Sequence, residues 1–454
     1  MDDRTADLVT RDHRYVWHPF TQQAAWVNDA PLVVERGEGC WLVTTDGRRF
    51  LDGNSSLWVN LWGHDRPELL AALHQQVDRL PHATFLGLTN PPAVELAERL
   101  VDLAPDGLTR VFFSENGAAA VEVALKMAFA FWRHRGDDQR RLFVCVDNAY
   151  HGDTLGAVSV GGFDTFHALY RDLLFETRRI PSPYCYRCPL GLTHPDCGLA
   201  CADALDDVLT RDGHLVAAVI TEPLVQGAAG MITAPDGHLA RLRDICDRHG
   251  VLLIVDEVAT GFGRTGATFA CDLEAVAPDL LAIGKGLTGG YTAMSATLAT
   301  EAIYDGFLGD PAQGRTFFHG HSYSGNPLAA AVANANLELL VAEDLPAIVR
   351  HKAAILADAL VPTRDLPHVG DVRQRGLMCG IELVADRPTK TPFAAQLLAG
   401  KRVCEALVDD GIILRPLGDV VVLMPAPAMD DDDLRHLAGA TTAAIDRVTR
   451  ELAR

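Results

Sequence analysis

An aspartate and a lysine, each at the end of an apolar run, are the residues of this chain whose types and spacing most clearly suggest chemistry. Residues 251–255 are all branched and apolar, and Asp256 and Glu257 follow them directly. A run that is apolar on both faces is typical of a strand in the middle of a parallel sheet covered by helices. Ligands of such sheets bind beyond the carboxyl ends of the strands, so the pattern places Asp256 at a binding site.

Lys285 stands 29 positions after Asp256, just beyond a second short strand predicted at residues 279–283. Pyridoxal phosphate needs such a pair: the lysine forms a Schiff base, and the carboxylate keeps the pyridine nitrogen protonated so that the ring acts as an electron sink. Other interpretations fit these two residues alone. An aspartate after a buried strand can also hold a metal or a nucleotide, and a lysine after a strand is usually a surface residue.

Length and charge narrow the class of protein. The 454 residues predict two or three lobes rather than one small core. The net charge of -20, without any run of Lys and Arg, argues against nucleic acid or an anionic membrane as a partner. The acidic first residues do not resemble a signal peptide, and no stretch of eighteen apolar residues occurs that could span a membrane. We therefore expect a cytoplasmic protein.

Four of the ten cysteines are paired along the chain in a way that is compatible with a metal. Cys185 and Cys188 are separated by two residues, and Cys197 and Cys201 by three, within an insertion at about 184–201. This spacing suits tetrahedral zinc that staples a surface loop, but it suits reduced thiols or a single redox pair as well. The other six cysteines lie in apolar or helical surroundings and are predicted to be core thiols.

Apolar strands and helical patterns alternate between residues 110 and 260, which predicts a parallel sheet with right-handed crossovers. Before this region, residues 1–35 are predicted to form an irregular arm, because Pro19 blocks a helix there, and a hairpin is predicted across the turn at 45–48. After residue 345, two strands at 369–383 and helices at 347–360, 394–409 and 431–450 predict an α+β lobe.

Two further segments are candidates for the walls of a binding site. Residues 54–64 carry Trp58 and Trp62 between polar and glycine ends, which suggests a pocket wall, although the two tryptophans could equally be one core face of a helix. The segment 116–118, Asn-Gly-Ala, opens a helix of small residues whose backbone N–H groups could approach a phosphate, although such helices are usually just tightly packed. Tyr150, shortly after a strand, could stack on an aromatic ring or cover the core.

In this order the pieces resemble the class III (ω-amino) aminotransferases of fold type I, which depend on pyridoxal 5'-phosphate. Residues 253–266 and the Gly-Lys-Gly at 284–286 carry most of the resemblance, which covers nearly the whole chain. It implies an α/β fold: a large cofactor-binding domain at 67–340, with a mostly parallel central sheet flanked by helices, and a smaller α+β domain built from 1–66 and 341–454. It also implies a homodimer with active sites at the interface.

The resemblance further implies the residues of the site. Lys285, Asp256 and Tyr150 would be catalytic. The cofactor would be bound by Asn116, Gly117, Ala118, Tyr150, His151, Glu222, Asp256, Gln226, Lys285 and Ser322. The substrates, a small-molecule amino donor and a keto acceptor, would be bound by Phe20, Trp58, Tyr150, Arg264, Gly320 and Arg415.

Within that family the chain is most similar to the biotin-pathway members that convert 8-amino-7-oxononanoate to 7,8-diaminononanoate. Residues 17–21, 52–58, 150–153 and 414–418 carry this likeness. Members that use S-adenosylmethionine as amino donor tend to have tyrosine where this chain has Phe20 and Val422. Loss of both hydroxyls removes hydrogen-bonding capacity from the donor pocket. Residues 20–22, 320–323 and 416–420 look more like the branch that takes its amino group from lysine, so the resemblance leaves S-adenosylmethionine and lysine as donors and favours lysine slightly.

Two other functions fit parts of the same pattern. Another transaminase of this fold, acting on an ω-amino acid or a diamine with pyruvate, would share the lysine and the aspartate. A zinc-stapled binding protein, with the four-cysteine loop as its functional part, would leave the cofactor residues unexplained.

Overall fold

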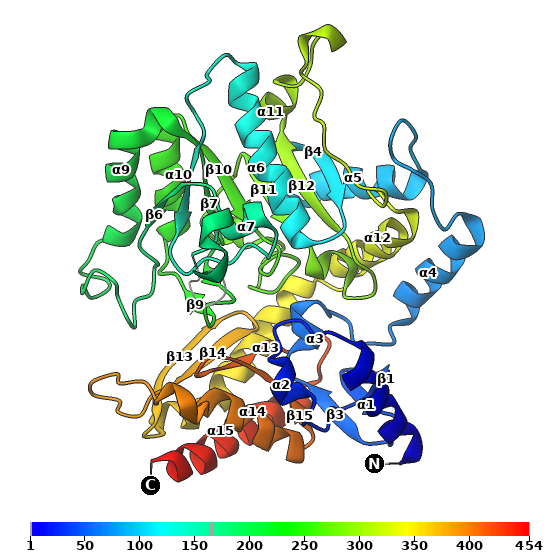
Figure 1. Ribbon diagram of the computed structural model, residues 1–454, viewed down its shortest axis with the longest axis vertical. Coiled ribbons are helices and arrows are strands. Elements are labelled where there is room, and N and C mark those ends of the chain that lie inside the picture. Colours follow the sequence, from blue (N-terminus) through cyan, green and yellow to red (C-terminus); the bar gives the residue numbers. More distant parts are fainter. Residues whose placement is uncertain (1, 163–167, 454) are drawn as a thin grey trace.

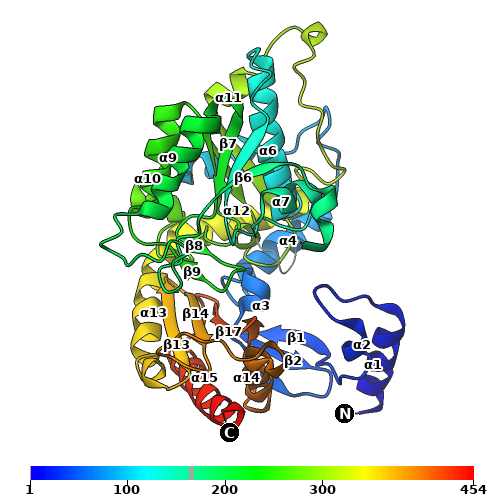
Figure 2. The same cartoon turned by 60° about the vertical axis from the view of Figure 1, so that its left-hand side comes forward.

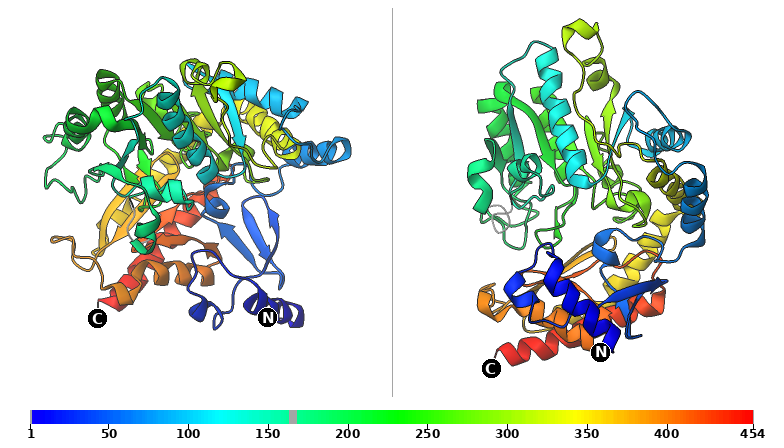
Figure 3. Two further views of the ribbon diagram at one scale, coloured as in Figure 1. Left: turned by 45° about the horizontal axis from the view of Figure 1, so that its top comes forward. Right: turned by 45° about the vertical axis from the view of Figure 1, so that its right-hand side comes forward.

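The computed structural model describes residues 2–162 and 168–453. A large lobe, formed by the middle of the chain, lies above a small lobe that contains both chain ends (Figures 1 and 3). Within the described residues, no helix is both long and apolar enough to cross a membrane.

The large lobe is organised around a seven-stranded sheet in the order β4-β12-β11-β10-β7-β5-β6. Only β12 runs antiparallel to its neighbours, so the predicted mostly parallel sheet is confirmed. Its strands are β4 Leu108–Ser114, β5 Leu142–Val146, β6 Thr177–Ile180, β7 Val216–Thr221, β10 Leu252–Asp256, β11 Leu280–Ile283 and β12 Ser295–Thr300.

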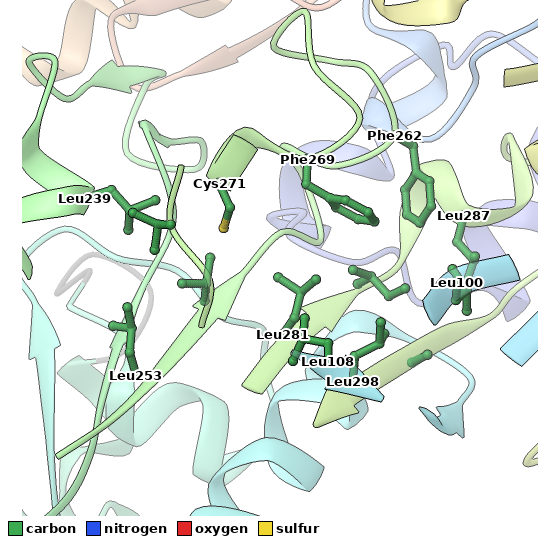
Figure 4. Close-up of a cluster of buried hydrophobic side chains, with 14 of the residues drawn as sticks. Leu100, Leu108, Leu239, Leu253, Phe262, Phe269, Cys271, Leu281, Leu287 and Leu298 are labelled. Atoms are coloured by element: carbon green, nitrogen blue, oxygen red, sulfur yellow. The ribbon is translucent and has the colours of Figure 1, made fainter. Parts of the chain in front are cut away.

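Alternate residues of the central strand β10 enter two different cores, because successive side chains of a strand point to opposite faces. Leu252 and Ile254 pack with helix α6, Gly117–His134, on one face. Leu253 and Val255 pack on the other, in the cluster that contains Phe262 and Phe269 (Figure 4). Burial on both faces explains why the run at 251–255 has no polar residue.

Helices cover both faces of this sheet. They are α4 Pro67–Arg79, α5 Pro91–Leu103, α6 Gly117–His134, α7 Leu155–Val160, α9 Ala200–Asp212, α10 His238–His249, α11 Glu301–Asp305 and α12 Pro327–Ala342. Three of them begin at an asparagine whose side chain accepts a hydrogen bond from the first turn, at Asn90, Asn116 and Asn326. Such caps fix where a helix starts, and the cap at Asn116 sets the position of the site described below.

The small lobe joins the two ends of the chain. In one sheet, β1 Val34–Glu38, β2 Trp41–Thr44 and β3 Arg49–Asp52 come from the N-terminal part, and β15 Ile412–Ile413 pairs with β3. The other sheet contains β13 Val369–Arg375, β14 Met378–Leu383, β16 Arg415–Leu417 and β17 Val420–Leu423. Helices α13 Leu345–Ala359, α14 Ala399–Asp409 and α15 Asp431–Leu452 pack against them. The predicted hairpin at 45–48 is confirmed, and the exact domain boundaries stay a prediction.

The prediction of an irregular arm at 1–35 was wrong over its first half. Residues Asp3–Tyr15 form helix α1, and Gln23–Trp26 form a short helix α2 (Figure 2). The Asp2 side chain caps the Thr5 N–H, and Pro19 lies beyond the helix end, where it cannot interrupt the helix.

The helix predicted to begin at 394 begins instead at Ala399, after a single 3-10 turn at Ala395–Leu397.

Candidate active site

A cavity of about 730 Å³ lies beyond the carboxyl ends of β7 and β10 and the start of α6. This is where a parallel sheet is expected to bind its ligand. The predicted site residues that line it are Trp58, Asn116, Gly117, Ala118, Tyr150, His151, Glu222, Asp256 and Lys285. They come from six separate segments of the chain.

Asp256, the last residue of β10, is fixed by two hydrogen bonds. Its Oδ2 lies 2.7 Å from His151 Nδ1, and its Oδ1 accepts from the Val258 N–H at 3.0 Å. Because a carboxylate can only accept, His151 must donate from Nδ1. Both side chains are buried, so the carboxylate is held in one orientation with its charge inside the cavity.

Lys285 lies in the same cavity, with its Nζ 4.8 Å from the centre of the Trp58 ring. Burial lowers the pKa of this lysine, and the negative charges of Asp256 and Glu222 oppose that shift. Its backbone has a φ of +42°, a strained conformation for a residue with a side chain. A buried amine with a lowered pKa is a suitable nucleophile for a carbonyl compound.

The first turn of α6 forms an anion-binding corner of the cavity. Asn116 caps the helix through its Oδ1, which accepts from the Ala119 N–H at 3.0 Å. A Cβ added to Gly117 would lie 2.6 Å from Val258 Cγ1, so only glycine fits there. The helix N-terminus therefore presents its backbone N–H groups without a side chain in front of them, as a phosphate group requires.

Glu222 and Tyr150 form the wall next to Asp256. Glu222 accepts from the Tyr150 N–H at 3.0 Å and from the Gly227 N–H at 2.9 Å. Burial raises the pKa of Glu222 to about 7. Burial and the hydrogen bond from its hydroxyl to Asp153, at 2.8 Å, also raise the pKa of Tyr150. The phenol therefore stays neutral at the rim of the cavity.

Glu122, which sequence reasoning missed, holds the segment after Tyr150 in place. Its Oε1 accepts from the Thr154 hydroxyl at 2.5 Å and from the Gly156 N–H at 2.8 Å. It thereby ties the start of α7 to the side of α6. The signal was present in the sequence, since Glu122 is the single charged residue of the otherwise small and apolar segment 117–125.

Arg264 does not line the cavity, and its contact with substrate stays a prediction. It is 1% exposed, and its guanidinium donates to the Ser55 Oγ and to the carbonyls of Asn60 and Pro425, at 2.7–3.0 Å. Ser55 to Trp58 is a short turn with positive φ values at all four residues. Arg264 therefore supports from behind the turn that carries Trp58 into the cavity.

Five other predicted residues also do not line the cavity. Gln226 is buried beside it and bonds to Ser182 and to the Asp147 carbonyl. Phe20, Gly320, Ser322 and Arg415 are exposed. Trp62, the second tryptophan of the predicted pocket wall, packs in the core of the large lobe instead.

The four paired cysteines lie together, away from this cavity. Cys185, Cys188, Cys197 and Cys201 line a separate cavity of about 20 Å³, and all four are free thiols. In the part of the chain that the structure describes, no group of three or more His, Cys, Asp or Glu side chains has the geometry of a metal site.

Comparison with known proteins identifies the family. The model of the class-III aminotransferases matches residues 22–445. The chain belongs to this family. It is 49% identical over 449 residues to the adenosylmethionine-8-amino-7-oxononanoate aminotransferase of Geobacter sulfurreducens, a match that covers 99% of each chain.

Two solved aminotransferases have the same fold. The adenosylmethionine-8-amino-7-oxononanoate aminotransferase of Methanocaldococcus jannaschii is 41% identical, with a TM-score of 0.93 over 97% of this chain and 99% of that one. An amine transaminase from an uncultivated Pseudomonas species, solved in its PLP-bound form, is 37% identical, with a TM-score of 0.91 over 96% of this chain and 98% of that one.

The protein is accordingly an aminotransferase that depends on pyridoxal phosphate. The cavity fits this group. It contains the buried Lys285, the carboxylate of Asp256 held by His151, and the helix start at Gly117, where any Cβ would collide with Val258. These are the three features required for the aldehyde, the pyridine nitrogen and the phosphate.

Proposed function

We propose that this aminotransferase converts 8-amino-7-oxononanoate to 7,8-diaminononanoate in biotin biosynthesis. The observation that carries the proposal is the placement of Lys285 and Asp256 in one cavity, in a chain that matches relatives named for this reaction over 99% of its length. The small-molecule amino donor and the keto acceptor would bind in this cavity one after the other, in a ping-pong transamination.

Each cavity residue then has a task. Pyridoxal phosphate, when bound, supplies an electron sink for the carbon that loses its proton. Lys285 would accept that proton and return it, because burial favours its neutral form. Asp256 would hold a proton on the ring nitrogen, and His151 keeps the carboxylate oriented for it. The N–H groups at 117 and 118 would hold the phosphate.

Trp58 supplies an apolar surface for the carbon chain of the acceptor. Its ring faces Lys285, and its indole N–H donates to Asn54 Oδ1 at 3.0 Å, which fixes the ring plane. For the acceptor carboxylate we propose Arg415, as expected from the sequence, because a guanidinium binds a carboxylate through two parallel hydrogen bonds. Phe20 and Gly320 stay proposed contacts of the substrates.

A homodimer would complete this site. Large apolar side chains are exposed on the N-terminal arm and on the segment 316–326, among them Trp17 at 87% and Phe318 at 81%. A second copy that covers them would bury apolar surface. We propose that it also brings Ser322 to the phosphate of the neighbouring site. Light scattering of the purified protein measures whether its mass is that of a dimer.

The cytoplasmic location expected from the sequence stays a prediction.

The decisive experiment is a single turnover of the cofactor-loaded protein with 7,8-diaminononanoate. In the reverse direction, the proposed reaction must change the absorbance of the cofactor and release 8-amino-7-oxononanoate. If the absorbance stays constant with this diamine while another amine changes it, the biotin-pathway proposal fails and the family assignment stands.

The same assay identifies the amino donor, which we propose to be either S-adenosylmethionine or lysine. The names of the relatives include adenosylmethionine, whereas Phe20 and Val422 replace the tyrosines expected with that donor. Val422 is buried in the cluster that contains Trp58, so a hydroxyl is missing close to the cavity. The donor is the compound that changes the cofactor absorbance and then supports amination of 8-amino-7-oxononanoate.

A broader amine transaminase is the second candidate, because a solved amine transaminase matches this chain with a TM-score of 0.91. It would transfer amino groups from ω-amino acids or diamines to pyruvate. Turnover of pyruvate at a rate comparable to that of 8-amino-7-oxononanoate would favour this candidate.

A further inference from the structure

The four-cysteine loop is the part of the molecule that transamination leaves unexplained. Residues 181–199, between β6 and α9, contain neither helix nor strand. A segment of this length without regular structure is uncommon in a compact domain unless something holds it. Cys185, Cys188, Cys197 and Cys201 nevertheless come together from its two ends, at the walls of one cavity of about 20 Å³.

The size and walls of this cavity restrict its ligand. It has room on the order of a single water molecule, which suits an ion and excludes an organic cofactor. Its walls include the apolar side chains of Pro183, Leu190 and Leu192, and the residues with possible metal ligands among its walls are the four cysteines and His194. It shares no residue with the walls of the active-site cavity.

The same loop connects the two lobes. Arg187 Nε donates to Glu382 Oε1 at 2.6 Å, and the hydroxyl of Tyr184 bonds to the same carboxylate. Glu382 belongs to β14 of the small lobe, where Arg373 also donates to it at 2.7 Å. Cys185 lies between Tyr184 and Arg187, so the cysteine cavity and this network share one short piece of backbone.

We propose that the four cysteines bind one thiophilic divalent metal ion of the zinc class, which holds the loop in the shape that contacts Glu382. Cys-x2-Cys followed by Cys-x3-Cys is a ligand spacing of tetrahedral thiolate sites. In this structure the four side chains line the cavity but do not have the geometry of metal ligands. Metal binding would therefore require their Sγ atoms to rotate toward the centre of the cavity. Each thiol gives its proton to solvent as its sulfur bonds to the metal, and no oxidation is involved.

The test is the zinc content of the holoenzyme, produced without a metal-binding tag and reconstituted with zinc sulfate under anaerobic conditions. Mass spectrometry of the washed protein is expected to find about one zinc per chain. Cys185→Ser and Cys197→Ser should each reduce the zinc at least tenfold at unchanged cofactor content. Cys404→Ser, which alters a buried cysteine in α14 of the small lobe, should keep it.

A thiol titration of the folded protein gives an independent answer that needs no variant. Zinc should protect the loop thiols, and a chelator should expose them to the reagent. The proposal is overturned if the reconstituted protein retains less than about a tenth of a zinc per chain. It is also overturned if the loop variants bind as much zinc as Cys404→Ser, since the metal then lies elsewhere.

Discussion

At Lys285, burial and the neighbouring carboxylates act in opposite directions on the charge of the amine. Desolvation lowers its pKa, whereas Asp256 and Glu222 favour the ammonium form. Burial thus makes the neutral amine of Lys285 easier to reach than that of an exposed lysine, and the carboxylates of Asp256 and Glu222 limit the effect.

Replacement of Lys285 by alanine should therefore abolish turnover while some cofactor remains bound, because the helix start and Asp256 are unchanged. Loss of a catalytic amine usually costs several orders of magnitude in rate. Steady-state rates and the cofactor content of the washed protein measure both effects. Lys401→Ala, at an exposed position of α14, is the control. Transamination by Lys285→Ala at a near-normal rate would contradict the assignment.

Glu222 should make the cofactor-free protein less stable as the pH rises. Burial raises its pKa from 4.5 to about 7, so between these values the folded protein binds a proton that the unfolded chain has lost. The resulting stability is fully present below pH 4.5 and is lost as the pH rises toward 7, up to about 3 kcal/mol in total. Urea unfolding at several pH values measures it, with Glu222→Gln as the reference. A constant difference between the two proteins from pH 5 to 8 would refute this origin.

At the scale of elements, the strained turn Ser55–Trp58 depends on a side chain from another part of the chain. Four consecutive residues with positive φ are unfavourable without outside support. Arg264 supplies that support through three hydrogen bonds, and its burial lowers the pKa of its guanidinium to about 9. The position of Trp58 thus depends on a residue that does not itself line the cavity.

Arg264→Met should displace Trp58 and lower kcat/KM by a factor of ten or more, because two carbonyls and a hydroxyl lose a buried donor. The loss should be the same for amino acceptors with and without a carboxylate. Steady-state kinetics with a matched pair of acceptors measures this. A loss confined to the carboxylate-bearing acceptor would instead indicate that Arg264 binds substrate. The same acceptor pair with Arg415→Met tests the proposed carboxylate contact.

At the scale of the whole molecule, Glu382 joins the two lobes. It is 6% exposed and accepts from Tyr184 and Arg187 of the large lobe and from Arg373 of the small lobe. These partners lower its pKa against the opposing effect of burial. The carboxylate is therefore ionised between the guanidinium groups of Arg187 and Arg373.

Glu382→Gln should destabilise the protein by about 3 kcal/mol, because it removes the charge that faces the buried guanidinium of Arg373 and the partly buried one of Arg187, and leaves Arg373 only its ion pair with Asp371. Denaturation by urea, followed by fluorescence, measures the loss. Asp432→Asn, at an exposed ion pair of α15, should change stability by less than about 0.5 kcal/mol. Equal effects of the two substitutions would show that the network between the lobes does not contribute.

Much of this molecule could be predicted from local patterns. The strand ending at Asp256, the lysine that follows, the helix start at Asn116 and the mostly parallel pairing of the central strands all leave a signal in local patterns. The prediction of an irregular arm was wrong because Pro19 was taken to prevent a helix throughout residues 1–35, whereas helix α1 ends at Tyr15, before the proline. Glu122 was missed because its partners lie about thirty positions away, on a segment that shows no pattern of its own.

The sequence by itself predicted Asp256 and Lys285 as the residues that carry the chemistry, since each follows an apolar run typical of a buried strand, and the structure places both runs as inner strands of the sheet. Tertiary structure alone decided the tasks of Arg264 and of the four-cysteine loop. Arg264 supports the turn that carries Trp58, and the four-cysteine loop contacts Glu382. The physical reason is that a buried polar side chain must bond to whatever the fold brings near it, and those partners are distant in sequence.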